Sequence, residues 1–254
     1  EASAGSKSKR RYVPAGITIE VSERPLPHAA VHHFHRPHLE SDLGDRAVVT
    51  VHHDLGERDP WLALPKFLPR YRQAQRVVCL NEGQRRRLGA EGVEQTTVIP
   101  HGYAADLFRP RTGRAETRPA GDERTWLGIV SRRYARRVKG EAYLHELVCH
   151  LDNERFAFVL VGEGRHHTAE HLASSGFETR VFQYLPYRLF QSLYEAMDYL
   201  LVTSNFEGGP ANLPEAIATH TPVITTPVGF APDFLTDGVS GLLLSGDPDL
   251  DAER

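Results

Sequence analysis

The sequence predicts an α/β protein of two consecutive units, each a parallel sheet flanked by helices. Short apolar runs alternate with helix-like segments along most of the 254 residues, which is typical of parallel α/β folds. The stretch from Phe108 to Glu123 is rich in Arg, Pro, Gly and Thr and has almost no apolar residues, as linkers do. We therefore expect an N-terminal unit over residues 1–110, a linker over 111–123 and a second unit over 124–254.

The first unit is expected to alternate short strands with helices. Its apolar runs predict strands at Ile17–Val21, Ala29–His33, Ala47–Val51, Arg76–Leu80 and Thr97–Ile99, and helices around Trp61–Gln73 and Glu82–Glu91. Pro65 and Pro69 are expected to interrupt the first helix, because proline has no backbone N–H to donate.

The second unit repeats this alternation. Strands are predicted at Trp126–Ser131, Phe156–Val161, Arg180–Tyr184, Tyr199–Thr203, Pro222–Thr226 and Gly241–Leu244, and helices at Glu141–His150, Leu189–Met197 and from Leu213 to Ala218. Two such units would place a cleft between them. Ligands of open α/β sheets bind beyond the carboxyl ends of the strands, so the loops that follow these strands are the places to search for a site.

The composition excludes several classes of protein. With 40% hydrophobic residues, 25% charged residues and a net charge of -3, the chain lacks the basic excess of a nucleic-acid binder. The sequence contains no apolar run of about 18 residues and no secretory signal at its start. Cys79 and Cys149 lie in apolar runs and predict buried free thiols in a reducing compartment, so we expect a cytoplasmic protein.

The densest chemical signal is the segment from Ser204 to Gly229, which reads as a Gly-rich turn followed by a helix. Gly208 and Gly209 allow a close approach of the backbone to a ligand, and the start of the helix offers unpaired N–H groups to a phosphate. Glu207 and Glu215 flank this cradle and could accept hydrogen bonds from sugar hydroxyls. The alternative is an ordinary turn between two solvated glutamates.

This segment, EGGPANLPEAIATHTPVITTPVG, together with the tail DFLTDGVSGLLLSGD, resembles the signature of retaining GT-B glycosyltransferases of the large family numbered four. The resemblance extends through VVTVHHD, VIPHGY, FVLVGEG and VFQYLP and covers roughly residues 28–247. It implies two Rossmann-like domains facing across a cleft, with the N-terminal domain incomplete. The family's opening strand and Gly-rich loop are not found before Tyr12, and its last helices do not follow Asp251.

The resemblance also implies roles for individual residues. Glu207 would contact hydroxyls of the transferred sugar and Glu215 the nucleotide ribose, while the diphosphate would meet the backbone of Gly208, Gly209, Asn212 and Leu213. In SRRYARRVKG, Arg132 and Lys139 match the family's diphosphate-binding cations. Because the spacing is slightly longer than expected, Arg133, Arg136 or Arg137 could substitute. Cations are needed here, since negative charge develops on the departing nucleoside diphosphate.

A histidine at the end of a strand is the candidate from the first unit. In VVTVHHD, His52 matches a family histidine that bonds the donor sugar or the departing phosphate. His53 is read as a neighbour and Asp54 stays ambiguous. His101 and Gly102 are expected to shape the cleft. An essential base at Asp54 or Glu57 would instead favour inversion of configuration.

Metal sites are not favoured by the sequence. His32, His33, His35 and His38 are close in sequence, but no carboxylate or cysteine lies at a recognised zinc spacing. Asp247, Asp249 and Asp251 resemble the start of a calcium loop without its glycine and are expected to begin a terminal helix. We expect no metal and no cofactor, with a nucleoside-diphosphate sugar as the donor substrate.

The predicted activity is transfer of a sugar from a nucleoside diphosphate to an acceptor hydroxyl, with retention of configuration. The acceptor could be a glycan, a lipid-linked molecule or a small molecule. The stretch Trp61-LALPKFLPRYR is read as a core-packing helix, with weak peripheral membrane contact as the alternative. Two other functions stay open: a sugar-nucleotide epimerase of the same fold, and an inactive or fragmentary sugar-nucleotide-binding protein.

Overall fold

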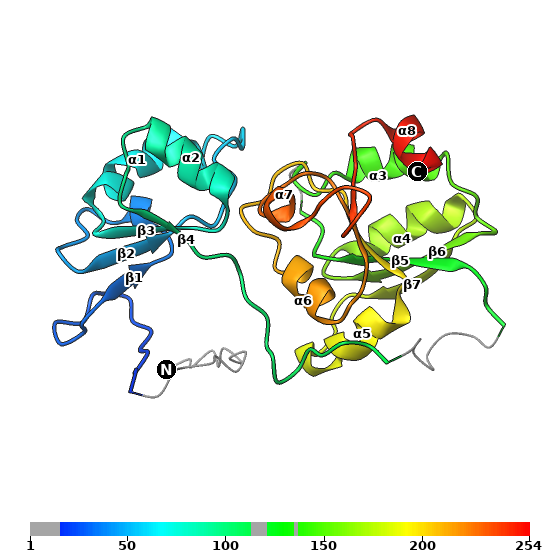
Figure 1. Ribbon diagram of the computed structural model, residues 1–254, viewed down its shortest axis with the longest axis horizontal. Coiled ribbons are helices and arrows are strands. Elements are labelled where there is room, and N and C mark those ends of the chain that lie inside the picture. The colour runs from blue at the N-terminus through cyan, green and yellow to red at the C-terminus, as the bar shows by residue number, and fades with distance from the viewer. Residues whose placement is uncertain (1–15, 113–120, 135–136) are drawn as a thin grey trace.

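The chain folds into two lobes, each built on a parallel sheet (Figure 1). The computed structural model describes residues 16–112, 121–134 and 137–254. Residues 113–120, the middle of the predicted linker, and Arg136, one of the alternative cations, lie outside the described residues.

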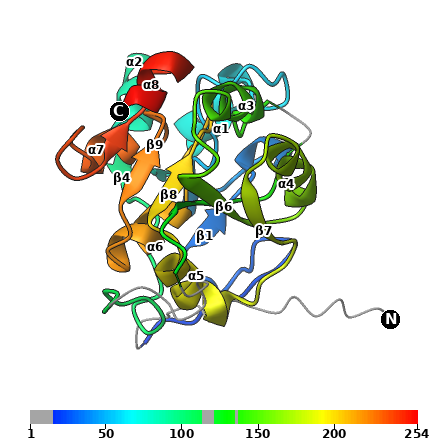
Figure 2. The same ribbon diagram turned by 90° about the vertical axis from the view of Figure 1, so that its right-hand side faces the viewer.

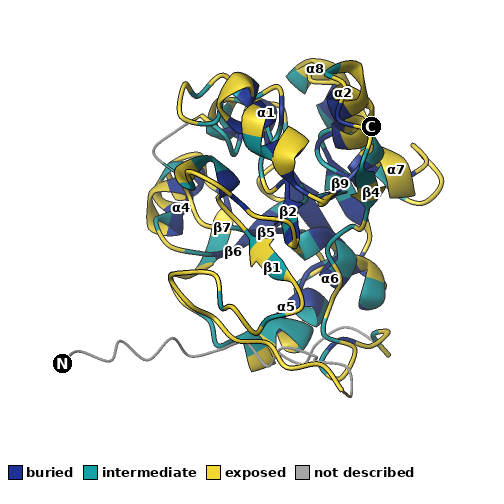
Figure 3. Cartoon of the chain, turned by 90° about the vertical axis from the view of Figure 1, so that its left-hand side faces the viewer, coloured by how far each residue is buried: buried dark blue, intermediate teal, exposed yellow. Residues whose placement is uncertain are grey.

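The first lobe contains a four-stranded sheet in the order β1-β2-β3-β4. Its elements are β1 (His32–Phe34), the 3-10 helix η1 (Pro37–Leu39), β2 (Ala47–Thr50), α1 (Leu64–Gln73), β3 (Arg76–Cys79), α2 (Glu82–Ala90) and β4 (Thr96–Val98). The helices α1 and α2 pack on the face of the sheet that carries Val49 and Val77, which are fully buried. Val48 and Val78 point to the other face and are only half-buried, and Figure 3 shows the outer strand β1 as half-buried or exposed beside the buried β2.

Two expectations for the first lobe are wrong. The alternating run Ile17–Val21 forms no strand. Its apolar side chains are all more than half exposed, so the alternation has no buried face to which it could respond. Helix α1 begins at Leu64 and continues across Pro69. Pro65 lies in the first turn, where an N–H would have no helical partner, and Pro69 removes only the bond to the carbonyl of Pro65.

The second lobe has a six-stranded sheet in the order β10-β9-β8-β5-β6-β7. Its strands are β5 (Thr125–Val130), β6 (Phe156–Val161), β7 (Glu178–Phe182), β8 (Tyr199–Val202), β9 (Val223–Thr225) and β10 (Leu242–Leu243). The chain moves outward in one direction from β5 to β7 and in the other from β8 to β10. This order is the doubly wound Rossmann arrangement, and the reversal between β5 and β8 is its switch point.

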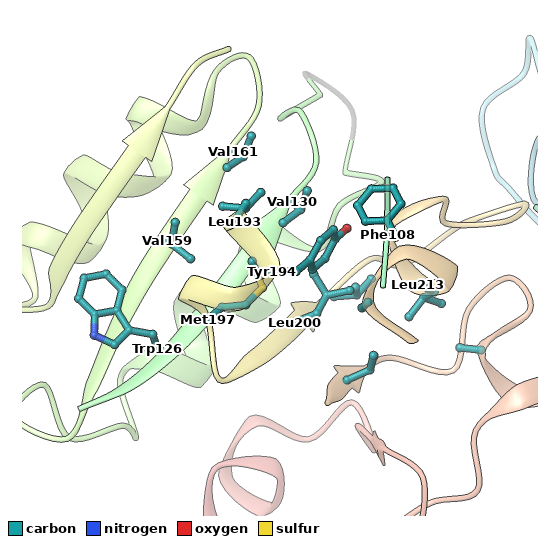
Figure 4. Packing of buried hydrophobic residues seen from close by; sticks show 14 of the residues in the cluster. Phe108, Trp126, Val130, Val159, Val161, Leu193, Tyr194, Met197, Leu200 and Leu213 are labelled. Carbon is teal, nitrogen blue, oxygen red and sulfur yellow. The ribbon is translucent and has the colours of Figure 1, made fainter. Parts of the chain in front are cut away.

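Helices cover both faces of this sheet. They are α3 (Glu141–Val148), α4 (Arg165–Ser174), the 3-10 helix η2 (Tyr187–Leu189), α5 (Phe190–Ala196), α6 (Asn212–Ala218), α7 (Ala231–Phe234) and α8 (Pro248–Glu253). Figure 2 shows α3 and α4 on the opposite side of the strands from α5. Strand β6 alternates accordingly: Phe158 and Leu160 join the α3–α4 core, whereas Val159 and Val161 pack with Leu193 of α5 (Figure 4).

Helix α4 was not predicted, because its buried face has a weak apolar pattern. The buried residues of this helix are Arg165, Thr168, Ala169 and Leu172, so two of the four are polar. The predicted terminal helix is present as α8, where the side chain of Asp247 accepts hydrogen bonds from the amides of Asp249 and Leu250. This is an N-cap.

The two lobes contact each other through the chain segments that lie beside the switch point. The Asn81 side chain donates to the carbonyl of Gly208 at 2.7 Å, and the amide of Glu82 donates to Asp233 of α7 at 2.8 Å. Phe108 is buried in the core of the second lobe, although the sequence places it in the first unit. The segment that precedes β5 is thus already attached to the second lobe before residue 113.

Candidate functional site

A small polar cavity lies at the switch point of the second sheet, beyond the carboxyl ends of β5 and β8. It is lined by residues from four loops and helix starts, among them Ser131, Lys139, Arg165, Ser204, Glu207 and Asn212. Three of these, Lys139, Glu207 and Asn212, are candidates from the sequence. Crevices of this kind are where open α/β sheets bind their ligands.

Lys139 and Glu207 form an ion pair in this cavity. Both side chains are only 13% exposed, and Ser204 donates a further hydrogen bond to Glu207 at 2.8 Å. The Thr203 hydroxyl donates to the backbone carbonyl of Lys139 at 3.0 Å. Glu207 is therefore a held carboxylate rather than a solvated charge, which contradicts the alternative interpretation of the motif.

The loop that carries Lys139 is docked on the end of β8 through a glycine. Gly140 has φ +66°, and a Cβ at this position would lie 1.7 Å from the carbonyl oxygen of Thr203. The amide and side chain of Asn205 donate to the carbonyls of Val138 and Arg137. The backbone of Gly140 thus lies directly against that of Thr203. This contact holds Lys139, the preceding residue, beside the switch-point cavity that it lines.

Arg132 lies on the same loop and shares an aromatic neighbour with Lys139. Its guanidinium carbon is 4.2 Å from the ring centroid of Tyr134, and the Lys139 ammonium is 5.5 Å from the same centroid. Of the alternative cations that the structure describes, Arg133 faces Glu141, and Arg137 is exposed, as Arg132 is. The two cations singled out by the resemblance are thus the ones that meet at one ring.

The glycines of the motif are needed for contact between the lobes. A Cβ on Gly208 would lie 2.4 Å from the carbonyl oxygen of His52, and one on Gly209 would lie 3.0 Å from Leu80. The close approach expected toward a ligand is, in this structure, a close approach to the first lobe.

The start of α6 is anchored to the central strand of the sheet. Asn212, its first residue, donates from its side chain to the carbonyl of Val130 at 3.1 Å, and Leu213 is buried in the core. Figure 4 shows Leu213 pointing into this core from the opposite side to Val159. The backbone after Gly209 is consequently held against the end of β5.

Glu215 is buried and bonded to two tyrosines. Tyr187 donates to one carboxylate oxygen at 2.6 Å and Tyr194 to the other at 2.9 Å. Burial, reinforced by the charge of Glu215, raises the pKa of both phenols. Glu215 is therefore not a solvated helix-end charge.

His52 belongs to a group of four histidines that sequence reasoning did not assemble. Its Nε2 lies 2.7 Å from Nδ1 of His35. The ring centroids of His33 and His35 are 4.5 Å apart, and those of His52 and His101 are 6.3 Å apart. The available signal was that residues two apart on a strand share a side, which brings His33 and His35 beside the end of the neighbouring strand β2.

The first lobe should lose stability in mild acid. Partial burial and the neighbouring imidazoles lower the pKa of His52 to about 4, and burial lowers that of His53 to about 4. Between pH 6.5 and 4 these histidines bind more protons in the unfolded chain than in the folded chain, so the free energy of unfolding falls as pH falls. We expect the thermal midpoint to drop by roughly 5 °C from pH 6.5 to 5. His53→Phe should give a shallower slope, and equal slopes would contradict this account.

The remaining sequence candidates have structural places. His53 packs on Phe67 with ring centroids 4.4 Å apart, and Asp54 accepts from the amide of Gly56 in its own turn. Cys79 is buried and free as expected, whereas Cys149 is free but exposed, because it follows the last turn of α3.

Over residues 16–112, 121–134 and 137–254, no group of three or more His, Cys, Asp or Glu is arranged to hold a metal ion. No helix of these residues is long and apolar enough to cross a membrane.

The sequence model of the family described as glycosyl transferases group 1 matches residues 124–254. That range is slightly more than half of the chain and contains the whole second sheet with its switch-point cavity. The chain belongs to this family. No curated protein matches the chain.

Solved glycosyltransferases share the fold of this group 1 family member. Sucrose-phosphate synthase from Thermosynechococcus elongatus is 20% identical with a TM-score of 0.68, over 82% of this chain and 57% of that one. A mutant of S. aureus TarM in complex with fondaparinux, alpha-GlcNAc-glycerol and UDP is 19% identical with a TM-score of 0.66, over 82% of this chain and 42% of that one. Anabaena HepE in complex with UDP and glucose is 20% identical with a TM-score of 0.63, over 82% and 60%. The chain thus has the GT-B fold and spans about half the length of these structures.

Proposed function

We propose that this chain provides the donor-binding half of an enzyme that transfers a sugar from a nucleoside diphosphate to an acceptor hydroxyl. One observation carries the proposal: Lys139 and Glu207, a cation suited to a phosphate and a carboxylate suited to sugar hydroxyls, meet in the cavity at the switch point. Rossmann sheets bind nucleotides at this place.

The roles follow from the position of each group. Lys139 and Arg132 would face the diphosphate together with the backbone from Gly208 to Leu213, and Glu207 would accept from the sugar. Glu215 would accept from the ribose. The hydrogen bonds from Tyr187 and Tyr194 hold its carboxylate in place. His52 would bond the sugar or the departing phosphate as a neutral imidazole, because its pKa is lowered to about 4.

We further propose retention of configuration without a metal ion. Inversion requires a general base opposite the leaving group. Two of the nearby carboxylates have other partners: Asp54 caps its own turn and Glu207 pairs with Lys139. An essential base at Glu57 would contradict the proposal. Arg132 and Lys139 would supply the positive charge that the departing diphosphate requires.

The donor and acceptor are proposed by class. The TarM and HepE structures were solved with UDP, so UDP is the first nucleotide to test. The acceptor is a hydroxyl compound.

A weak contact with a membrane surface is a subsidiary proposal, because Trp61 is 77% exposed and Lys66 lies over its ring. The two free thiols support action in a reducing compartment such as the cytoplasm.

Calorimetric titration with UDP, GDP and ADP tests the donor site. We expect one of the three to bind and Glu215→Ala to weaken that binding by roughly 30-fold, as loss of a buried hydrogen bond to a charge does. Glu154→Ala, an exposed glutamate at the other end of the sheet, should bind as wild type does. If folded wild-type protein binds none of the three, the donor-site proposal is wrong. Binding without transfer by the full-length protein would favour the inactive sugar-nucleotide-binding alternative.

A further inference from the structure

Arg165 is a fully buried arginine beside the candidate donor site, and no role is yet assigned to it. It is the first residue of α4, it lines the switch-point cavity, and 1% of its surface is exposed. A buried guanidinium is costly unless its N–H groups find acceptors. Arg165 follows the turn Gly162-Glu163-Gly164, and its side chain reaches Ser131, the residue after β5.

The guanidinium bridges two points of the neighbouring chain. Its Nε donates to the carbonyl of Ser131 at 2.7 Å, and one Nη donates to the Ser131 hydroxyl at 2.9 Å. The other Nη donates to Glu141 at 2.6 Å and to Thr168 at 3.2 Å. Thr168 in turn donates to the second oxygen of Glu141, so the bridge is a closed network.

These two points are the ends of the cation loop, defined as the described residues 131–134 and 137–141. Ser131 directly precedes Arg132, and Glu141 follows Lys139 by two residues. We propose that Arg165 is a positioning residue that fixes the width of the cation loop, and thereby the place at which Arg132 and Lys139 meet a nucleoside diphosphate. This inference rests on the proposed donor site.

The geometry requires an arginine rather than any cation. Three nitrogens of one planar group reach Ser131 on one side and Glu141 on the other, and lysine has a single nitrogen. The second half of the loop, from Arg137 to Gly140, is tied to the segment after β8 by Thr203, Asn205 and Glu207. In its first half, besides the Arg165 bridge, the amide of Arg133 donates to the carbonyl of Glu163. That tie also belongs to the turn before Arg165.

The test compares Arg165→Lys and Arg165→Met in the full chain. The probes are the diphosphate that wild type binds best among UDP, GDP and ADP, and the nucleoside with the same base. We expect either variant to weaken diphosphate binding at least tenfold and nucleoside binding less than twofold, since only the diphosphate touches the cation loop. Arg155→Met, an exposed arginine before β6, is the matched control. Arg165→Lys keeps the buried charge opposite Glu141, so it serves if Arg165→Met does not fold.

A double-mutant cycle with Lys139→Met separates positioning from general support of the fold. Because Arg165 is proposed to position Lys139 as well as Arg132, Arg165→Lys should weaken diphosphate binding in the wild-type background and have a clearly smaller effect in the Lys139→Met background. Equal effects in both backgrounds, or equal losses for nucleoside and diphosphate, overturn the inference. Diphosphate binding by wild type that Arg165→Lys leaves unchanged overturns it while the donor site stands. Absence of any nucleotide binding by folded wild type overturns both.

Discussion

Lys139→Met is expected to weaken binding of the nucleoside diphosphate about 100-fold, the scale of losing a hydrogen bond between charged groups worth up to about 3 kcal/mol. The ammonium group lies in the switch-point cavity and is held there by Glu207 and by the docked backbone of Gly140. The ammonium group therefore needs little reordering when the diphosphate binds. Replacing Lys139 with methionine removes both the positive charge and its preorganised position. Calorimetry on the variant and on wild type measures the loss.

A second variant separates charge from stability. Lys139→Met alone leaves Glu207 as a largely buried carboxylate without its cation, which should lower the free energy of unfolding by about 3 kcal/mol. Lys139→Met combined with Glu207→Gln removes both charges and should recover most of that stability in urea denaturation. Diphosphate binding should stay lost in the double variant. If the double variant binds as wild type does, Lys139 is structural.

Gly140→Ala should be the most destabilising small substitution in the second lobe, lowering the free energy of unfolding by about 3 kcal/mol or more. The new Cβ would lie 1.7 Å from the Thr203 carbonyl oxygen and 2.7 Å from its carbon, and both are backbone atoms that cannot rotate away. The positive φ adds a smaller cost of about 1 kcal/mol. Urea denaturation at constant pH measures the sum.

Gly238→Ala is the matched control for this substitution. Gly238 has φ +72°, close to the +66° of Gly140, and a Cβ there meets no atom within 4 Å. It should cost only the conformational term of about 1 kcal/mol. The difference between the two variants then isolates the steric contact between the cation loop and β8. Equal losses for both would show that this contact has little effect.

The parts of the fold predicted well from sequence are those with a strong local pattern. Strand β6 has the predicted bounds Phe156–Val161, because a run of apolar residues buried on both faces leaves little choice of structure. Lys139 and Glu207 were also identified separately, and the structure joins them. A recurring motif contains this information, since the resemblance assigns both residues to one nucleotide sugar.

Other features depended on tertiary contacts that no local pattern contains. Arg165 reads as a surface cation in the sequence, yet it is buried because Ser131 and Glu141 supply acceptors from distant positions. The contact between His35 and His52 requires the register of two parallel strands, which pairs Phe34 with Val49. Ile17–Val21 shows the opposite case. Its sequence alternates as a strand does, but its apolar side chains stay exposed because no other element packs on them.

The contact between Gly208 and the first lobe couples two equilibria. Gly208 follows Glu207 directly, its carbonyl accepts from Asn81, and its Cα lies against the backbone of His52. A nucleotide that reorders Glu207 and Gly208 must therefore change how tightly the lobes hold each other. By thermodynamic reciprocity, the hold between the lobes changes nucleotide affinity by the same factor. For a nucleotide that moves Glu207 or Gly208 on binding, the separation of the lobes in solution would report the occupancy of the proposed donor site.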